Sequence, residues 1–327
     1  MAEDLNKKIE ELQEDDLDAV AKTIKIMTKH LNFCALMALV AMGVVFTACT
    51  AYSDNPVKPV GIAIDETNFP DECFRNSLFR CYDFAEDGIL TAEEIKNTTT
   101  LEVDWDQIES LKGIEYFTAL KKLYCYGNEI TELDLSKNTA LTYLDCDCNR
   151  ITKLTISNNA LLDTLYCSDN ELTELDVSNN PALVYLDCYD NKLTQLDVTK
   201  NTALVQLDFD SNQITSIDLS NNIWLEELYC SNNGLTKLDL SKNLELESLY
   251  CCQNKISGQN MDALIGSLPL NDTPTYFDFA VIDYNEGVEK EGNVCTKAQV
   301  EAAKAKGWKP LQWDDDEFYW IDYPGSE

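Results

Sequence analysis

The feature that most constrains this 327-residue chain is a pattern that returns every 21 residues between residues 120 and 256. The copies follow the consensus L-x-x-L-x-C-x-x-N-x-[IL]-T-x-L-D, with departures at single positions. They begin at Leu120, Leu141, Leu162, Leu183, Leu204, Leu225 and Leu246. Several separate columns stay in step over this length, so the copies are structural repeats and this part of the chain folds as an array.

One copy is too short to bury its own leucines, so neighbouring copies must stack and share a core. Side chains alternate along a strand, so the second leucine and the cysteine of each copy face inward, and the strands stack as a parallel sheet. The asparagine after each strand offers its amide to backbone groups that lose their sheet partners, and a second asparagine column should act likewise on the far side. The columns are Asn128, Asn149, Asn170, Asn191, Asn212, Asn233 and Asn254, and Asn138, Asn159, Asn180, Asn201, Asn222 and Asn243.

The pattern resembles the leucine-rich repeat at the short end of its length range. That resemblance implies an α/β-type solenoid, an arc with a parallel β-sheet on its concave face. The return segments, such as residues 130–135, are too short and too rich in threonine and aspartate for a regular helix. We therefore expect short turns and extended segments on the convex face. The repeats occupy residues 119–259, and a cap is expected at each end because open ends would expose core and sheet edge.

The chain is strongly acidic, with 25 lysines and arginines against 58 aspartates and glutamates and a net charge of −33. Nucleic acid binding needs a basic face, so this balance argues strongly against a nucleic acid partner. Two interpretations stay open: the acidity serves solubility, or it attracts a basic partner or cations. The one histidine, His30, falls in a segment that we expect to be removed. A chain without histidine lacks the commonest general base and a common zinc ligand, so we predict that this protein is not an enzyme.

The N-terminal segment resembles a bacterial lipoprotein signal. Residues 27–30 precede an apolar run to Phe46, too short for an easy membrane span, and small residues then lead to Cys49. The resemblance implies cleavage before Cys49, lipidation of that cysteine, and anchoring at the outer surface of the bacterial cell envelope, although Phe46 stands where the family usually has leucine. Residues 1–26 are then an extension from a misplaced start codon, 27–48 the signal and 49–60 a tether. The alternative is a cytosolic protein with a buried apolar helix.

Residues 61–118 should cap the array at its N-terminal end. Pro70 suits the first turn of a helix that runs to about Cys81, which places Phe74, Leu78 and Cys81 on one face.

The segment that follows this helix, residues 83–94, resembles an EF-hand loop. The resemblance implies a weak calcium site whose ligands are Asp83, Asp87, Ile89, Thr91 and Glu94. Residue 85 is alanine, which removes the third ligand of the family pattern. The alternative is a relic turn in which the glycine at position 88 only makes the bend.

Residues 101–117 are expected to form a degenerate first repeat with Ile108, Leu111 and Ile114 as its inward set. The segment 108–117 resembles the first repeat of bacterial internalin-like surface proteins. Residues 60–310 together resemble surface leucine-rich-repeat lipoproteins of gut-type bacteria. The resemblance implies an extracellular binding or adhesion role and gives no fixed ligand.

The 21-residue pattern fails at Gln259, and residues 260–327 should form a C-terminal cap. We expect a short helix over 260–268, a strand over 276–284, a helix from Thr296 that stops at Gly307, and a strand over 308–313. The tail at 314–320 mixes acidic and aromatic residues. It is expected to cover the sheet edge, and a binding site is the alternative.

The sequence holds 13 cysteines, of which Cys34 leaves with the signal and Cys49 carries the lipid. Strand spacing would separate neighbours in the inward column by about 4.8 Å with parallel side chains, whereas a disulfide wants Cβ atoms about 3.8 Å apart. The column therefore serves as small hydrophobic core residues. Pairing among Cys73, Cys81, Cys251, Cys252 and Cys295 stays open.

The outward positions of the sheet carry eight tyrosines interspersed with aspartates. Tyrosine combines apolar area with a polar tip, which suits an interface. The alternative is that the tyrosines stack on their neighbours and stiffen the sheet. The predicted ligand-binding residues are Tyr124, Tyr143, Asp145, Tyr166, Tyr185, Asp187, Tyr189, Asp208, Tyr229 and Tyr250.

Two classes of function follow. The first is a surface binding or adhesion module that captures an extracellular protein or glycan on the concave face. The alternative is a carboxylate-based glycan hydrolase that uses paired acids such as Asp187 and Asp208, or an accessory glycan-binding protein of a surface uptake system. We expect an open sheet face to exclude water poorly and to leave carboxyl pKa values near their ordinary range, which disfavours the hydrolase.

Overall fold

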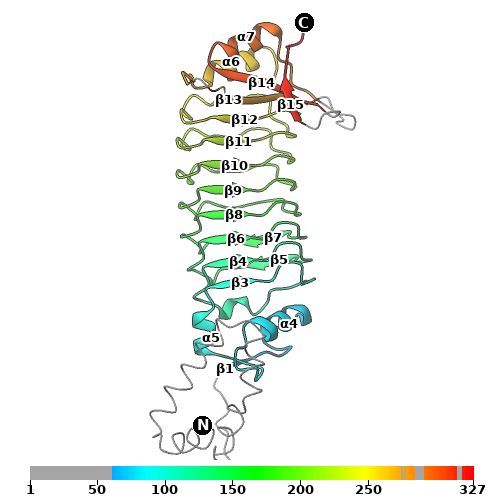
Figure 1. Cartoon of the computed structure of the whole chain (residues 1–327), viewed down its shortest axis with the longest axis vertical. Coiled ribbons are helices and arrows are strands. Elements are labelled where there is room, and N and C mark those ends of the chain that lie inside the picture. The colour runs from blue at the N-terminus through cyan, green and yellow to red at the C-terminus, as the bar shows by residue number, and fades with distance from the viewer. Residues whose placement is uncertain (1–60, 274, 276, 284–290, 315–318) are drawn as a thin grey trace, which may run out of the picture. The chain divides into compact units, whose positions relative to one another are not determined.

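The computed structural model describes residues 61–273, 275, 277–283, 291–314 and 319–327, which lie within the compact unit Pro59–Glu327 (Figure 1). The predicted extension, signal, lipidation site Cys49 and tether fall outside the described residues.

The body of this unit is an 11-stranded sheet in the order β15-β14-β13-β12-β11-β10-β9-β8-β6-β4-β3 (Figure 1). Neighbouring strands from β3 to β14 are parallel, and β15 is antiparallel to β14. In this sheet, β4, β6 and β8–β12 each occupy the same three positions of their repeat. The strands are β3 (Thr100–Glu102), β4 (Lys122–Tyr124), β6 (Tyr143–Asp145), β8 (Thr164–Tyr166), β9 (Tyr185–Asp187), β10 (Gln206–Asp208), β11 (Glu227–Tyr229), β12 (Ser248–Tyr250), β13 (Phe277–Ile282), β14 (Trp308–Asp314) and β15 (Tyr319–Asp322).

The inward columns form one continuous core. Every leucine of the two leucine columns is buried, as is the cysteine column, in which Phe209 takes one place. The degenerate first repeat is confirmed, because Ile108, Leu111 and Ile114 join this core and β3 pairs with β4. Each repeat therefore gains its core from its neighbours, as a solenoid requires.

Both asparagine columns bind backbone, but not in the same way. In the first column, Asn191 donates from Nδ2 to the Cys167 carbonyl at 2.9 Å, and its Oδ1 accepts from the Leu172 amide at 2.9 Å. In the second, Asn201 donates to two carbonyl groups of earlier repeats, at 3.0 and 2.9 Å. The Oδ1 atoms of six second-column asparagines have no hydrogen-bond partner among the described residues.

A column of left-handed backbone lies just before the first asparagine column. Its φ angles run from 45° to 69°, and the residue is glycine only at Gly127. The turn after each strand requires this conformation, which most side chains adopt at a cost. The other members are Trp105, which holds the same place before the first repeat, and Cys148, Asp169, Asp190, Ser211, Asn232 and Gln253.

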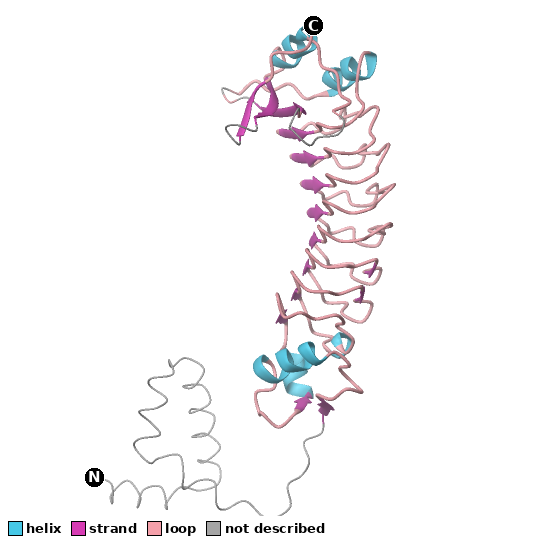
Figure 2. Cartoon of the chain, turned by 90° about the vertical axis from the view of Figure 1, so that its right-hand side faces the viewer, coloured by secondary structure: helices cyan, strands magenta, loops and turns pink. Residues whose placement is uncertain are grey.

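The convex side contains turns and extended chain, as expected. Within the described repeats, β5 (Glu132–Asp134) and β7 (Lys153–Thr155) pair as a second, two-stranded parallel sheet, and a 3₁₀ helix, η1 (Ile114–Tyr116), precedes the first full repeat. Figure 2 shows the stack edge-on, with the main strands on one side and the return segments on the other.

The N-terminal cap consists of β1 (Gly61–Ala63), α4 (Glu72–Cys81), β2 (Ile89–Thr91) and α5 (Ala92–Asn97). Asp71 is the N-cap of α4, so Pro70 lies before the helix and not in its first turn. Phe74 and Leu78 are buried as predicted, but the inward placement of Cys81 is wrong. Cys81 is the last helical residue and is exposed, whereas the next residue, Tyr82, packs against the core.

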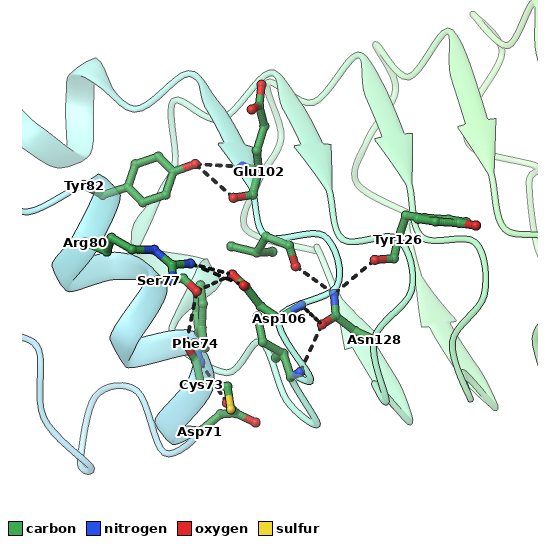
Figure 3. A network of polar contacts seen from close by, with 12 residues as sticks. Asp71, Cys73, Phe74, Ser77, Arg80, Tyr82, Glu102, Asp106, Tyr126 and Asn128 are labelled. Carbon is green, nitrogen blue, oxygen red and sulfur yellow. Dashed lines mark hydrogen bonds and ion pairs between the residues drawn. The ribbon is translucent and has the colours of Figure 1, made fainter.

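Polar contacts join this cap to the array (Figure 3). Asp106 accepts from Ser77 at 2.5 Å and forms an ion pair with Arg80 at 3.2 Å. The Tyr82 hydroxyl accepts from the Glu102 amide at 2.7 Å. This contact occupies a backbone donor on the outer strand β3, so the cap protects the sheet edge.

The C-terminal cap continues the sheet instead of only covering it. Helices α6 (Gln259–Ser267) and α7 (Lys297–Lys304) lie beside β13 and β14, and β13 pairs with β12 in the register of the repeats. Thr296 caps α7 with a reciprocal bond to Gln299, and Gly307 has the left-handed φ of 81° that ends the helix, both as predicted.

Candidate functional site

We call the outward side chains of β4, β6 and β8–β12, together with the next outward residue after each strand, the sheet face. All ten predicted ligand-binding residues lie on it, because strand pairing is in register from one repeat to the next. Their columns run across the strands, which are about 4.8 Å apart.

Most of the tyrosines of the sheet face form two runs of ring contacts. The first run joins Tyr124 to Tyr143 at 4.8 Å between ring centroids and Tyr143 to Tyr166 at 5.9 Å. The second joins Tyr229 to Tyr250 at 4.8 Å in a stacked geometry. The stacking interpretation therefore applies to these five tyrosines.

Tyr185 and Tyr189 differ from the other predicted tyrosines. They lie between the two runs, expose 41% and 38% of their surface, and make no ring contact with a described residue. Stacking does not explain these two side chains, so they are the accessible aromatic residues at the centre of the face.

Aspartates occupy the space between the aromatic runs. Asp208 lies directly opposite Asp187 on the neighbouring strand, and a second row contains Asp147 and Asp210. The carboxylates are tied to the backbone and to hydroxyl groups. The Ser168 hydroxyl donates to Asp187 at 2.5 Å, and the Ser168 amide donates to Asp147 at 2.6 Å. Ser168 is consequently buried, although its position faces outward.

The carboxyl groups of this centre have raised pKa values. Burial, followed by the charge of neighbouring aspartates, raises the pKa of Asp147 to about 7. Burial and the adjacent Asp210 and Asp187 carboxylates raise the pKa of Asp208 well above its ordinary range, and burial likewise raises the pKa of Asp210. Burial also raises the pKa of Asp145. The expectation that an open face leaves carboxyl pKa values ordinary is wrong, since flanking side chains desolvate the carboxylates.

Raised pKa values alone do not make a hydrolase. Catalysis of glycoside cleavage also needs a substrate bound where water is excluded. The two described cavities, of 450 and 320 Å³, lie elsewhere: one beside η1 and β5, the other between α6 and α7. Nothing described over Asp187 and Asp208 encloses a sugar, so the hydrolase has no positive support.

The predicted calcium loop is a hydrogen-bonded turn in which the carboxylates face backbone donors. Glu94 accepts from the amides of Phe84 and Thr91, at 2.9 and 2.8 Å, and Asp83 accepts from Gly88 at 2.8 Å. Burial acts to raise the pKa of Glu94, but these hydrogen bonds lower it overall.

The other predicted calcium ligands are Asp87, Ile89 and Thr91. Asp87 accepts from the Ile89 amide, and Thr91 caps α5. In the described part of the chain, no three or more histidine, cysteine, aspartate or glutamate side chains are grouped to hold a metal ion. Calcium binding stays a prediction, and it requires Glu94 to give up its present donors.

The described cysteines are all free thiols. The inward ones stack along the core. In four of them, Cys125, Cys146, Cys167 and Cys188, Sγ donates to a carbonyl of the next repeat, as Cys167 does to Asp187 at 3.3 Å. Burial raises the pKa of these thiols well above its ordinary value, so they are core residues and not nucleophiles.

Trp105, beside the sheet face, escaped the sequence prediction, and Trp320 was predicted only as part of the 314–320 tail. Trp105 is 66% exposed in the left-handed column and packs edge-to-face on Tyr126 at 4.9 Å, above Gly127. Trp320 of the C-terminal strand contacts Tyr250 at 5.5 Å. The 21-residue pattern includes neither residue. The only available sequence signal for Trp105 was its place about one repeat before Gly127.

Cys49 and the signal lie outside the described residues, so lipidation stays a prediction. No helix in the described ranges is both long enough and apolar enough to cross a membrane.

The fold defines a leucine-rich-repeat solenoid with parallel strands. Residues 118–159 match the family described as Leucine Rich repeats (2 copies). Internalin J of Listeria monocytogenes serotype 4b (strain F2365) is 39% identical over 71 residues, which is 22% of this chain and 8% of that protein.

Solved structures agree with this class. The functional domain of InlJ from Listeria monocytogenes, which includes a cysteine ladder, is 34% identical with a TM-score of 0.53, covering 75% of this chain and 55% of that one. Internalin C2 of the same species is 22% identical with a TM-score of 0.56, and the similarity covers 62% of this chain and 93% of that one. At this identity, the similarity concerns the fold alone. The chain thus spans only part of Internalin J and of the solved InlJ chain.

Proposed function

We propose that this protein is a bacterial cell-surface module that captures an extracellular protein on its sheet face. The observation that carries the proposal is the exposed pair Tyr185 and Tyr189, set among carboxylates at the centre of the face. Binding energy at protein interfaces concentrates in a few aromatic anchors surrounded by polar groups. This arrangement on a rigid sheet provides such anchors at low entropic cost.

Surface location and adhesion are part of the same proposal. The similarity to internalins supports a protein partner, and the signal-like segment before Cys49 supports a lipid anchor.

The test is a binding screen of the full-length protein against arrays of extracellular proteins and of glycans. The double variant Tyr185→Ala/Tyr189→Ala should lose at least tenfold in affinity for any captured protein, because each anchor contributes on the order of 1–2 kcal/mol. Its melting curve should stay nearly unchanged.

The matched control is Leu161→Ala/Trp224→Ala, which removes exposed side chains from the turns that precede β8 and β11. This control should bind normally. Capture of a neutral glycan but no protein, or a double variant that binds normally and melts early, contradicts the proposal.

A further inference from the structure

The C-terminal strands extend the sheet face beyond the last repeat. Strands of the C-terminal cap stand out from the column of repeat strands on the side that the sheet faces (Figure 2). Trp320 on β15 packs edge-to-face on Tyr250 at 5.5 Å and on Trp313 at 5.3 Å, and Tyr250 stacks on Tyr229. We call Tyr229, Tyr250 and Trp320 the aromatic corner. It lies where the repeats meet the C-terminal cap, because two of these residues come from repeats and one from the cap.

The border of the aromatic corner is acidic. The Tyr229 hydroxyl donates to Glu227 at 2.9 Å, which holds that carboxylate beside the rings. Asp278 lies in the same row two strands further along, because β11, β12 and β13 are in register. Lys309, the neighbour of Asp278 on β14, forms an ion pair with Asp322 at 3.1 Å. The described carboxylates at the corner thus exceed its cations.

The carboxylate pair Asp187 and Asp208 lies on the same face, nearer the centre. Like charges placed directly opposite on neighbouring strands are unfavourable, so the Asp187 carboxylate contributes to the raised pKa of Asp208, which a bound cation would lower. In the six main-sheet strands β6 and β8–β12, the outward positions hold no lysine or arginine. The described ion pairs also leave these two carboxylates without a cation. A partner can therefore supply the missing positive charge.

We propose that the aromatic corner holds a lysine or arginine of an extended partner segment, while the Asp187–Asp208 pair holds a second cation of that segment. This inference rests on the proposed function and names the partner's chemistry. A cation over an aromatic face is attracted by the ring, the more so when it is desolvated. A guanidinium additionally stacks on tryptophan, so arginine is the better fit.

The geometry fixes the spacing of the two cations. From Asp187 on β9 to Tyr250 on β12 there are three strand intervals, or about 14 Å at ~4.8 Å each. An extended chain advances about 3.4 Å per residue, and residues i and i+4 point to the same side. Two cations at positions i and i+4 of the partner segment therefore match this distance of about 14 Å, whereas cations at i and i+2 are only about 7 Å apart.

The experiment uses the full-length protein and labelled synthetic peptides of threonine, valine and serine, read by fluorescence anisotropy. One peptide carries arginines at i and i+4, one at i and i+2, and one replaces both arginines by neutral citrulline. The i, i+4 peptide should bind about five- to thirtyfold tighter than the citrulline peptide, the range of one desolvated cation–π contact. Its affinity should fall as salt rises.

Variants of the protein then locate the binding. Trp320→Ala should lose about five- to thirtyfold for the i, i+4 peptide, and Trp320→Phe should recover part of it. Asp208→Asn should remove the preference for i, i+4 over i, i+2. Trp224→Ala, which removes an exposed tryptophan off the sheet face, should change nothing. A thermal melt of each variant excludes misfolding as the cause.

Several results would overturn the inference: equal binding of the charged peptides, equal binding of the citrulline peptide, competition by a neutral oligosaccharide, or normal binding by a folded Trp320→Ala. These failures are separable from the proposed function. If Tyr185→Ala/Tyr189→Ala abolishes protein capture while Trp320→Ala does not, the binding module stands and the aromatic corner is not part of it. If the array captures no protein at all, the proposed function fails irrespective of the corner.

Discussion

The two asparagine columns should differ in their contribution to stability, although both are buried. We predict that Asn191→Ala destabilises the fold by about 1–3 kcal/mol more than Asn201→Ala, the cost of one buried donor left without an acceptor. Both substitutions remove the same atoms, and the two residues lie in one repeat, residues 183–203. The two truncations therefore leave cavities of matched size. The difference between the free energies of unfolding of the two variants then reports the lost hydrogen bonds alone.

The magnitude follows from what each truncation leaves behind. Without Asn191, the Leu172 amide loses its acceptor. The carbonyl groups that Asn191 binds each keep a second donor, as Cys167 keeps Asn170 at 3.3 Å and Cys188 keeps Asn212 at 2.9 Å. One buried N–H is then orphaned.

Asn201 leaves no orphaned donor. The carbonyls of Val177 and Asn180 keep bonds from the amides of Asn180 and Leu183, at 3.0 and 3.2 Å. The Oδ1 of Asn201 already lacks a partner, so its removal also relieves an unsatisfied group. Asn201→Ala thus costs less than Asn191→Ala.

The assay is urea unfolding of the full-length protein under reducing conditions, followed by far-UV circular dichroism. At an m-value of about 2–3 kcal/mol/M, the two midpoints should differ by roughly 0.5–1 M. Asn158→Ala is the control, because Asn158 makes one exposed bond to the Ser136 carbonyl and its loss should stay within about 0.5 kcal/mol. Equal midpoints for Asn191→Ala and Asn201→Ala, or a larger loss at Asn201, would refute the reasoning.

Three further predictions concern the anchor, the calcium loop and the acidic centre. Cys49→Ser should move the protein from the membrane fraction to the soluble fraction, since stable anchoring needs the acyl chains. Calorimetry should detect weak calcium binding that Glu94→Gln abolishes, and heat that survives this substitution returns the loop to a structural turn. Asp147 has a pKa of about 7 in the folded state against 3.8 as its ordinary value. The folded state therefore binds its proton more tightly, and stability should fall as pH rises from about 4 through 7. Asp147→Asn should flatten that dependence in urea melts.

The repeat period made most of the fold predictable. Once leucine and cysteine alternate within a 21-residue period, strand register follows, because a slip of one residue would turn the leucines to solvent. Leu186 and Leu207 consequently lie opposite each other, as the sequence columns predict. Helices α4, α6 and α7 of the caps followed from local signals, such as the Thr296 cap and the Gly307 stop, whereas α5 was not predicted.

What the sequence did not predict depends on neighbours far along the chain. Asp147 is buried among other repeats, and the Ser168 amide that donates to it lies 21 residues later. Trp105 adopts a left-handed backbone that its residue type disfavours, so only the column of Gly127 indicates it. Trp320 reaches Tyr250 because β14 and β15 continue the sheet, which no repeat pattern specifies.

The sheet face carries costs that the core does not require. Asp187 and Asp208 oppose each other, so the ionisation of both is unfavourable, and Trp105, beside the face, combines a left-handed backbone with 66% exposure. None of these side chains fills the inward columns, which are complete with leucine, cysteine and asparagine. Inward columns repeat from copy to copy, whereas outward columns vary, so the face can change without disturbing the stack. Features that lower stability and serve no core contact are best explained by contact with a partner, and a cationic one would relieve the repulsion between Asp187 and Asp208.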